Sequence, residues 1–261
     1  PNLSPWMDSL GHWIESNDPH TRYAGGQRVV DESTVQELAG LLVADASGVL
    51  VVGHLRSDAD RAGVLTLGEM LGWPIVADLG SGLRAGVSSS HMIHQLDVIL
   101  QHDAAMSDAP DAVIHLGGRF LSKRVQAWIN RHQPSIYVLC NDSDHQMVPG
   151  MVTHRVLGSV QAFCEDLARA SKPGTDRTWL ERWQQRQSLC TEVLNVQLQS
   201  VLSEPALART VSRLIPAGHH MFLGNSMPVR DMDMFTWPEC QAAGIHANRG
   251  ASGIDGLIAS A

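Results

Sequence analysis

The residues of this chain that could do chemistry are concentrated near its carboxyl end. Positions 248–256 read Asn-Arg-Gly-Ala-Ser-Gly-Ile-Asp-Gly, so three glycines, an arginine and a serine fall within a few residues. Glycines let a backbone approach a ligand closely, and a loop that opens a helix points free amide groups at anions. The spacing predicts either an anion-binding loop or a tight strand-to-helix turn whose glycines serve packing alone.

Ser226 and Arg230 form a second candidate site, four positions apart within the segment Phe222–Asp231. A hydroxyl and a guanidinium together suit a carboxylate or a phosphate, because arginine donates paired, charge-assisted hydrogen bonds. The alternative is a serine that caps a helix and an arginine that faces solvent.

Lys123 and Arg124 form a third candidate site. They follow the apolar run 112–116 and the pair Gly117–Gly118, and the chain has only one other lysine. Open α/β sheets bind ligands at the carboxyl ends of their strands. We therefore expect this basic pair either to reach an anionic substrate or to be two solvated charges on a helix.

The two carboxyl-terminal segments together resemble a known family. Residues 222–231 and 248–256, in this order, are similar to a signature of the 2-succinyl-5-enolpyruvyl-6-hydroxy-3-cyclohexene-1-carboxylate synthases, thiamine-diphosphate enzymes of menaquinone biosynthesis. The similarity is sharp from Phe222 onward. Upstream it depends on weaker likenesses such as Leu71-Gly72-Trp73-Pro74.

The resemblance implies a substrate contact for each basic candidate. Ser226 and Arg230 would bind the carboxylate of the succinyl unit derived from 2-oxoglutarate. Arg249 would bind the carboxylates of the substrates, chiefly isochorismate. Lys123 and Arg124 match a basic pair of the family's active site.

The resemblance also implies how the glycine-rich run would hold thiamine diphosphate. Ile254 would be the aliphatic wedge that bends the cofactor, and the carbonyl of Gly253 would accept a hydrogen bond from its amino group. Asn248 and Ser252 complete the implied cofactor-binding set. The cofactor would supply the carbon chemistry, while the protein would supply shape and electrostatics.

The implied activity is that of a transferase that decarboxylates 2-oxoglutarate and adds the succinyl unit to isochorismate, with thiamine diphosphate and Mg²⁺ as cofactors. The family's activating glutamate and its magnesium motif have no match in this sequence, so no metal ligand is predicted here. We expect a piece of a longer enzyme, inactive and unable to hold the cofactor tightly by itself. The parent is expected to be a homodimer or homotetramer, because such cofactor sites form between subunits.

Two other functions stay open. The chain could belong to another thiamine-diphosphate 2-oxoacid decarboxylase or synthase, although those relatives generally lack the run at 248–256. It could also be a non-catalytic α/β binding module whose glycines are structural. The choice of substrate would separate the first alternative, and the flanking reading frame would separate the second.

Composition and charge exclude several other classes of protein. A formal net charge of −8 argues against a general nucleic-acid binder. No apolar run is long enough to span a membrane, and no signal peptide opens the chain. Four widely spaced cysteines fit buried thiols in a reducing compartment, so we expect a cytoplasmic protein. The pairs His91/His94 and His219/His220 lack a third metal ligand at a recognisable spacing.

Apolar runs that alternate with helical segments must position these candidates. Strands are expected at 48–53, 74–77, 112–116, 135–140 and 152–156, and helices at 33–42, 57–72, 92–101, 122–132 and 160–170. This alternation predicts a parallel sheet with helices on both faces. The fold class is therefore three-layer, Rossmann-like α/β. The loop Gly53–Ser57 lacks the glycine pattern of a dinucleotide site.

A second α/β unit is expected after the linker at 171–175. Its predicted elements are helices at 178–201 and 204–214 and strands at 219–223 and 244–247. The predicted domains are thus an irregular lead-in (1–32), a central Rossmann-like domain (33–172) and the first part of a diphosphate-binding domain (173–261).

Overall fold

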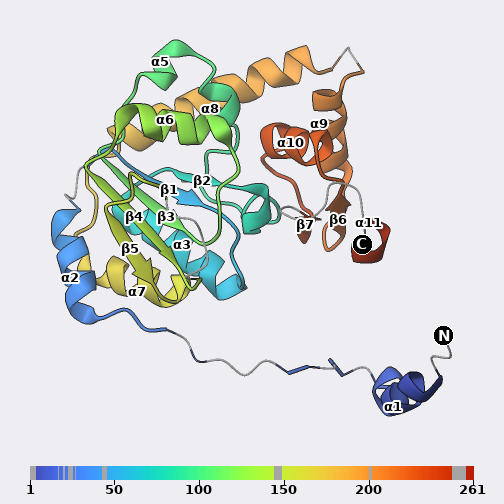
Figure 1. Ribbon diagram of the computed structural model, residues 1–261. Coiled ribbons are helices and arrows are strands. Elements are labelled where there is room, and N and C mark those ends of the chain that lie inside the picture. The colour runs from blue at the N-terminus through green and yellow to red at the C-terminus, as the bar shows by residue number, and fades with distance from the viewer. Residues whose placement is uncertain are drawn as a thin grey trace.

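The computed structural model describes residues 4–16, 18–19, 21–22, 26, 28–42, 46–143, 149–199, 202–248 and 257–261. Within these residues, one sheet has five strands and a second has two, and all neighbouring strands are parallel. Figure 1 shows the two sheets joined across the top by the long helix α8 (Thr178–Gln197).

The five-stranded sheet has the order β2-β1-β3-β4-β5. Its strands are β1 (Gly48–Val52), β2 (Ile75–Ala77), β3 (Ala112–Leu116), β4 (Ile136–Asn141) and β5 (His154–Leu157). Every residue of β1, β2 and β3 is buried, as continuous apolar runs predict for strands covered on both faces. The strand order reverses between β1 and β3, which is where sheets of this kind form a ligand crevice.

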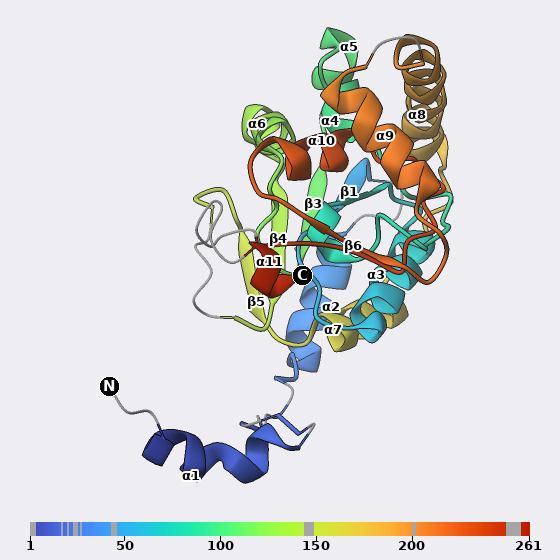
Figure 2. The ribbon, with the colours of Figure 1, turned by 90° about the vertical axis from the view of Figure 1, so that its right-hand side faces the viewer.

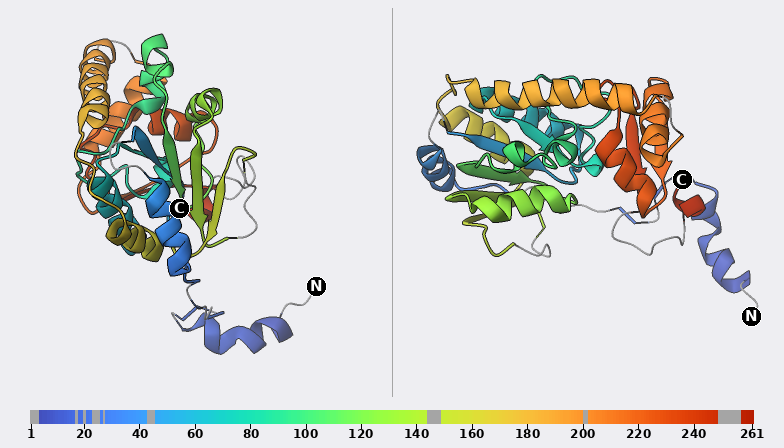
Figure 3. Two further views of the ribbon diagram at one scale, coloured as in Figure 1. Left: turned by 90° about the vertical axis from the view of Figure 1, so that its left-hand side faces the viewer. Right: turned by 90° about the horizontal axis from the view of Figure 1, so that it is seen from above.

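Helices cover both faces of this sheet (Figures 1 and 3). One face carries α2 (Glu32–Leu41), α3 (Asp58–Leu71) and α7 (Val160–Ala170), and the other carries α4 (Leu96–Ile99), α6 (Lys123–His132) and α8, with α5 (Asp103–Met106) beyond. Side chains of β1 alternate between the two cores, because successive residues of a strand point to opposite faces. The predicted three-layer α/β fold is confirmed.

Local signals in the sequence account for the element ends that position the sheet. Ser57 caps α3: its hydroxyl accepts from the Asp60 amide, and the Asp60 carboxylate accepts from the Ser57 amide. The same helix ends at Gly72, whose φ of 70° is easily adopted only by glycine. Predicted and observed bounds coincide for β3, α7 and α9 (Glu204–Leu214), and β7 (Gly244–Ala247) ends where a short strand was expected to end.

The two-stranded sheet pairs β6 (His220–Leu223) with β7 and packs against α9 and α10 (Met227–Phe235). The short helix α11 (Leu257–Ser260) lies beside β6 in Figures 1 and 2. Leu79 and Ala85, which follow β2, share one apolar core with Leu223, Met232 and Ile245. The connection after β2, which includes the turn η1 (Leu79–Ser81), therefore contacts both sheets.

Two predictions about helices were wrong. The lead-in predicted as irregular contains helix α1 (Ser4–Ile14), which lies apart from both sheets in Figure 2. Its apolar residues recur three or four positions apart, a helical spacing that the short segment made easy to overlook. The helix predicted at 92–101 is reduced to α4, because residues 91–93 run beside β2, with the Ile93 amide donating to the Ile75 carbonyl at 2.9 Å.

Candidate functional site

The carboxyl ends of β6 and β7 bring the two signature segments together. Leu223 is in register with Ala247, so the residues that follow each strand emerge side by side. The Asn225 side chain donates from Nδ2 to the Asn248 carbonyl at 3.0 Å. Segments more than 20 residues apart in the sequence thus meet at the carboxyl ends of these strands. Residues 224–230 and Asn248, which follow the two strands, are called the β6–β7 edge.

Helix α10 presents Ser226 and Arg230 to solvent at this edge. Both residues are exposed, whereas Val229 and Met232 between and beyond them are buried. Ser226 has a φ of 73°, an unusual value for a residue with a side chain. It occupies the N-cap position of α10, but its side chain makes no capping bond. The Ser226 hydroxyl therefore lies at the start of α10 and Arg230 lies in its first turns, four residues further on, both exposed.

Asn248 is half-buried and is also held from the other side, since its Nδ2 donates to the Ser260 hydroxyl of α11 at 2.9 Å. Gly224, directly after β6, would accommodate a Cβ in ordinary contact, since the nearest atom, of Leu257, would lie at 3.8 Å. The remaining predicted residues of the glycine-rich run, Arg249, Ser252, Gly253 and Ile254, lie outside the described residues.

The two residues of the basic pair on α6 have different surroundings. Arg124 is ion-paired with Asp97, and its Nη1 also donates to the Asp97 carbonyl at 2.9 Å. The Ser122 hydroxyl, which caps α6, donates to the same carboxylate. Lys123 is exposed, and within the described part of the chain no carboxylate forms an ion pair with it.

A buried histidine supports the turn that leads to this pair. His115 Nε2 lies 2.8 Å from the Gly118 carbonyl, and Nδ1 lies 3.2 Å from the Tyr137 hydroxyl. Burial lowers the pKa of His115 to about 4 and raises the pKa of Tyr137 to about 12. A neutral ring that donates from Nε2 and accepts at Nδ1 satisfies both partners. The turn at Gly117–Gly118 is therefore fixed from beneath.

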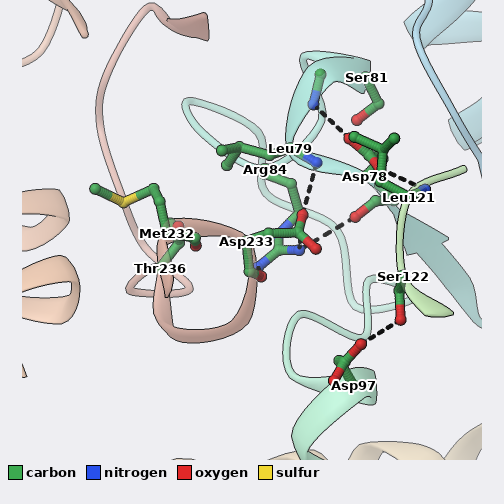
Figure 4. Close-up of polar contacts among 12 residues, drawn as sticks. Asp78, Leu79, Ser81, Arg84, Asp97, Leu121, Ser122, Met232, Asp233 and Thr236 are labelled. Atoms are coloured by element: carbon green, nitrogen blue, oxygen red, sulfur yellow. Dashed lines mark hydrogen bonds and ion pairs between the residues drawn. The ribbon is translucent and has the colours of Figure 1, made fainter. Parts of the chain in front are cut away.

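Three polar residues that the sequence reasoning missed, Asp78, Arg84 and Asp233, connect these regions (Figure 4). The Asp78 carboxylate accepts from the Leu121 amide at 2.9 Å, just before α6. Arg84 Nη2 donates to the Asp233 carbonyl of α10 at 2.7 Å, and the Asp233 carboxylate accepts from the Leu79 amide at 2.9 Å. Asp78 directly follows a buried strand, which is the one sequence signal that could have identified it.

At the crevice between β1 and β3, an aspartate side chain of the protein accepts the backbone hydrogen bonds that a bound anion could accept. A cavity of about 490 Å³ lies there, lined by residues that include His54, Arg56, Gly117 and Gly118. The Asp60 carboxylate at its edge accepts from the amides of Arg56, Ser57 and Gln161 at 3.1–3.2 Å. The amides of the loop that leads into α3 and one amide of the first turn of α7, which could contact a phosphate, are therefore bonded to an aspartate of the chain.

Comparison with known proteins identifies the family of this chain. A model of the family described as "Middle domain of thiamine pyrophosphate" matches residues 4–223. The chain belongs to this family. The match covers the five-stranded sheet and lies upstream of most of the signature segments, where the sequence alone offered only weak similarities.

Named relatives are similar over nearly the whole chain. A 2-succinyl-5-enolpyruvyl-6-hydroxy-3-cyclohexene-1-carboxylate synthase of Rubrobacter xylanophilus is 38% identical over 97% of this chain and 45% of its own length. A synthase of the same name from Prosthecochloris aestuarii is 36% identical over 99% of this chain and 44% of its own length. "Protein PHYLLO, chloroplastic" of Arabidopsis thaliana is 28% identical over 98% of this chain and 17% of its own length. The chain thus spans less than half the length of the curated relatives it matches.

The described residues at the β6–β7 edge suit an acidic ligand. The β6–β7 edge offers a hydroxyl, a guanidinium and the uncapped amides of α10, which are donors that suit carboxylates and phosphates. No group of three or more His, Cys, Asp or Glu side chains that could hold a metal occurs among the described residues.

Two further findings concern membranes and thiols. Within the described ranges, every helix is too short or too polar to cross a lipid bilayer. All four cysteines are free: Cys140, Cys164 and Cys240 are buried, as expected, and Cys190 is half-buried. Burial raises the pKa of each thiol, which makes them weak nucleophiles.

Proposed function

We propose that this chain is part of a thiamine-diphosphate-dependent synthase that decarboxylates 2-oxoglutarate and adds the succinyl unit to isochorismate in menaquinone biosynthesis. The observation that carries the proposal is the meeting of the two signature segments at the β6–β7 edge, through the bond from Asn225 to Asn248. The names of the relatives support the same reaction. The proposed cofactors are thiamine diphosphate and Mg²⁺, and the proposed parent is a cytoplasmic homodimer or homotetramer.

The residues of this chain would bind and orient two acidic reactants. Ser226 and Arg230, both exposed near the start of α10, are proposed to hold the carboxylate of 2-oxoglutarate. Lys123 is proposed to bind a carboxylate of the second reactant, and Arg124 to contribute the donors that Asp97 leaves available. Arg249 remains a proposed ligand of isochorismate. Such positioning converts a reaction between two molecules into one within a complex.

The cofactor would be held by the run that follows β7. Asn248, Ser252, Gly253 and Ile254 are proposed to contact thiamine diphosphate, which supplies the carbanion chemistry when bound. The proposed domains are a lead-in (1–32), the central Rossmann-like domain (33–172) and part of the diphosphate-binding domain (173–261). We propose that residues 1–261 alone are inactive and bind the cofactor weakly.

The proposal is tested with the natural gene product that contains this chain, loaded with thiamine diphosphate and Mg²⁺. Product formation from isochorismate is measured with 2-oxoglutarate and, separately, with pyruvate. We expect turnover with 2-oxoglutarate and little with pyruvate. Turnover of pyruvate alone would instead favour another 2-oxoacid decarboxylase or synthase, and a protein active on neither would contradict the proposed reaction.

A calorimetric titration tests the claim about the isolated chain. Residues 1–261 are titrated with thiamine diphosphate in the presence of Mg²⁺, beside the natural gene product as the positive control. We expect the isolated chain to show little binding heat. Affinity equal to that of the control would overturn the claim.

A further inference from the structure

The connection between β2 and α4 contacts both groups of proposed substrate residues. For brevity, Ser122–Arg124 is called the α6 arm and Ser226–Arg230 the α10 arm. Asp78, at the start of the connection, is 2% exposed. One of its carboxylate oxygens accepts from the Gly80 amide at 2.9 Å, and the other accepts from the Leu121 amide at 2.9 Å. Leu121 directly precedes the α6 arm.

Arg84 links the same connection to α10. It is 4% exposed; its Nη1 donates to the Ala77 carbonyl at 3.2 Å and its Nη2 to the Asp233 carbonyl at 2.7 Å. The Asp233 carboxylate lies 3.6 Å from Nη1 and also accepts from the Leu79 amide at 2.9 Å. One guanidinium therefore spans the end of β2 and a turn of α10, and an independent amide bond reinforces the contact.

The contacts of this connection fix the orientation of the elements that carry the two arms. Asp233 lies three residues after Arg230 on α10, so a fixed Asp233 fixes the rotation of the helix that presents the α10 arm. Arg84 is buried, so a placement of α10 that removed its carbonyl partners would leave a buried charge without compensation, which disfavours that placement. Asp78 acts likewise on the backbone that leads into the α6 arm. Figure 4 shows both sets of contacts radiating from this one connection.

We propose that Asp78 and Arg84 are positioning residues: from one connection, Asp78 sets the placement of the α6 arm and Arg84 sets the placement of the α10 arm. The proposal rests on the proposed function, because the arms are taken to bind the two acidic reactants. It assigns a separate arm to each residue. Arg84 serves the 2-oxoglutarate end of the site, and Asp78 serves the end that binds the second reactant.

The test is a crossed comparison of Arg84→Met and Asp78→Asn in the loaded natural gene product. Because misplacing a substrate-orienting group by about an ångström can cost on the order of a hundredfold, we expect Arg84→Met to raise the KM for 2-oxoglutarate about tenfold or more. Its KM for isochorismate should change less than about twofold, and Asp78→Asn should show the reverse pattern. Arg182→Met is the matched control, since Arg182 is half exposed and pairs with Asp108, which contacts neither arm. It should alter neither KM.

Hydrogen exchange of the α10 amides keeps the proposal testable if activity is low. Arg84→Met should speed exchange in α10 while that of α6 stays unchanged, and Asp78→Asn should do the opposite. If Arg84→Met does not fold, Arg84→Lys is used, which keeps the charge but cannot span both carbonyls. A purely structural role would reduce the active fraction without separating the two KM values.

The outcomes separate this inference from the proposed function. Equal effects of both variants on both KM values, or no effect in a folded protein, would overturn the inference. An unmodified protein that is inactive on both substrates would overturn the proposed function instead. In that case the exchange pattern of α10 and α6 would still decide whether Arg84 and Asp78 position them.

Discussion

The crevice between β1 and β3 and the β6–β7 edge are alike in topology and different in chemistry. Both lie at the carboxyl ends of adjacent parallel strands, where α/β sheets bind ligands. In the crevice, the Asp60 carboxylate already accepts from the amide of Ser57, which caps α3, and from that of Gln161 in the first turn of α7. At the edge, Ser226 makes no capping bond and Arg230 is exposed.

The packing of the backbone also differs between the crevice and the β6–β7 edge. The amide of Gly118 donates to the His54 carbonyl at 2.8 Å, which draws the loops after β1 and β3 into contact. At the β6–β7 edge the described contact between the two loops is made by a side chain, Asn225, and a Cβ at Gly224 would lie no closer than 3.8 Å to a neighbouring atom. The comparison suggests a division of roles: the position after β1 and β3 serves stability, and we propose that the position after β6 and β7 serves ligand binding. Substitutions in the two places should therefore have opposite consequences.

Gly53→Ala should have the largest effect on stability. A Cβ at Gly53 would lie 2.0 Å from the Gly118 carbonyl oxygen, so the loops after β1 and β3 must separate. We expect the free energy of unfolding to fall by about 3 kcal/mol, as for severe overpacking. Gly224→Ala is the control and should cost less than about 1 kcal/mol. Urea titrations of both variants check this, and equal losses would remove the distinction between the two places.

Asp60→Ala should have the next largest effect. It removes the acceptor of three amides and breaks the capping box of α3, so we expect a loss of about 2 kcal/mol. Asp58→Ala is the matched control, because Asp58 is an acidic residue of the same helical turn whose side chain is 92% exposed. Its removal should cost no more than about 0.5 kcal/mol. Thermal melts of the two variants that coincide would show that Asp60 does not hold the crevice.

His115 should make the five-stranded unit sensitive to acid. Burial lowers its pKa from 6.5 to about 4. Between these values the unfolded chain binds a proton that the folded chain does not, so the free energy of unfolding falls as the pH falls from 6.5 to about 4. The contribution is at most about 1.4 kcal/mol per pH unit and is absent above this window. Urea titrations across the window should be shallower in pH dependence for His115→Gln, and parallel curves would refute the assignment.

Much of the fold could be predicted, since its signals are local. Strand β3 is an apolar run bounded by turn residues, and α7 and α9 begin at serine caps. The shortening of α4 could not be predicted, because residues 91–93 are taken up by pairing with β2. That constraint is tertiary and leaves no local pattern.

The candidate site likewise contains residues that the sequence could predict and residues that it could not. Ser226, Arg230 and Lys123 could be selected from residue type and spacing, and whether they bind substrates stays a prediction. Arg84 and Asp233 could not be paired, since 149 positions separate them and a buried arginine looks like any other in the sequence. The ion pair between Arg124 and Asp97 could not be predicted for the same reason.

Arg230 should have the smallest effect on stability and the most direct effect on function. We compare Arg230→Met in the loaded natural gene product with Arg169→Met, which removes another exposed arginine, on α7. Both melting curves should match that of the unmodified protein, because each change in the free energy of unfolding should stay within about 0.5 kcal/mol. The KM for 2-oxoglutarate should rise only in Arg230→Met, by roughly ten- to a hundredfold, since a hydrogen bond to a charged group contributes about 1.5–3 kcal/mol. An unchanged KM in that folded variant would contradict the claim that the β6–β7 edge binds the acidic reactant.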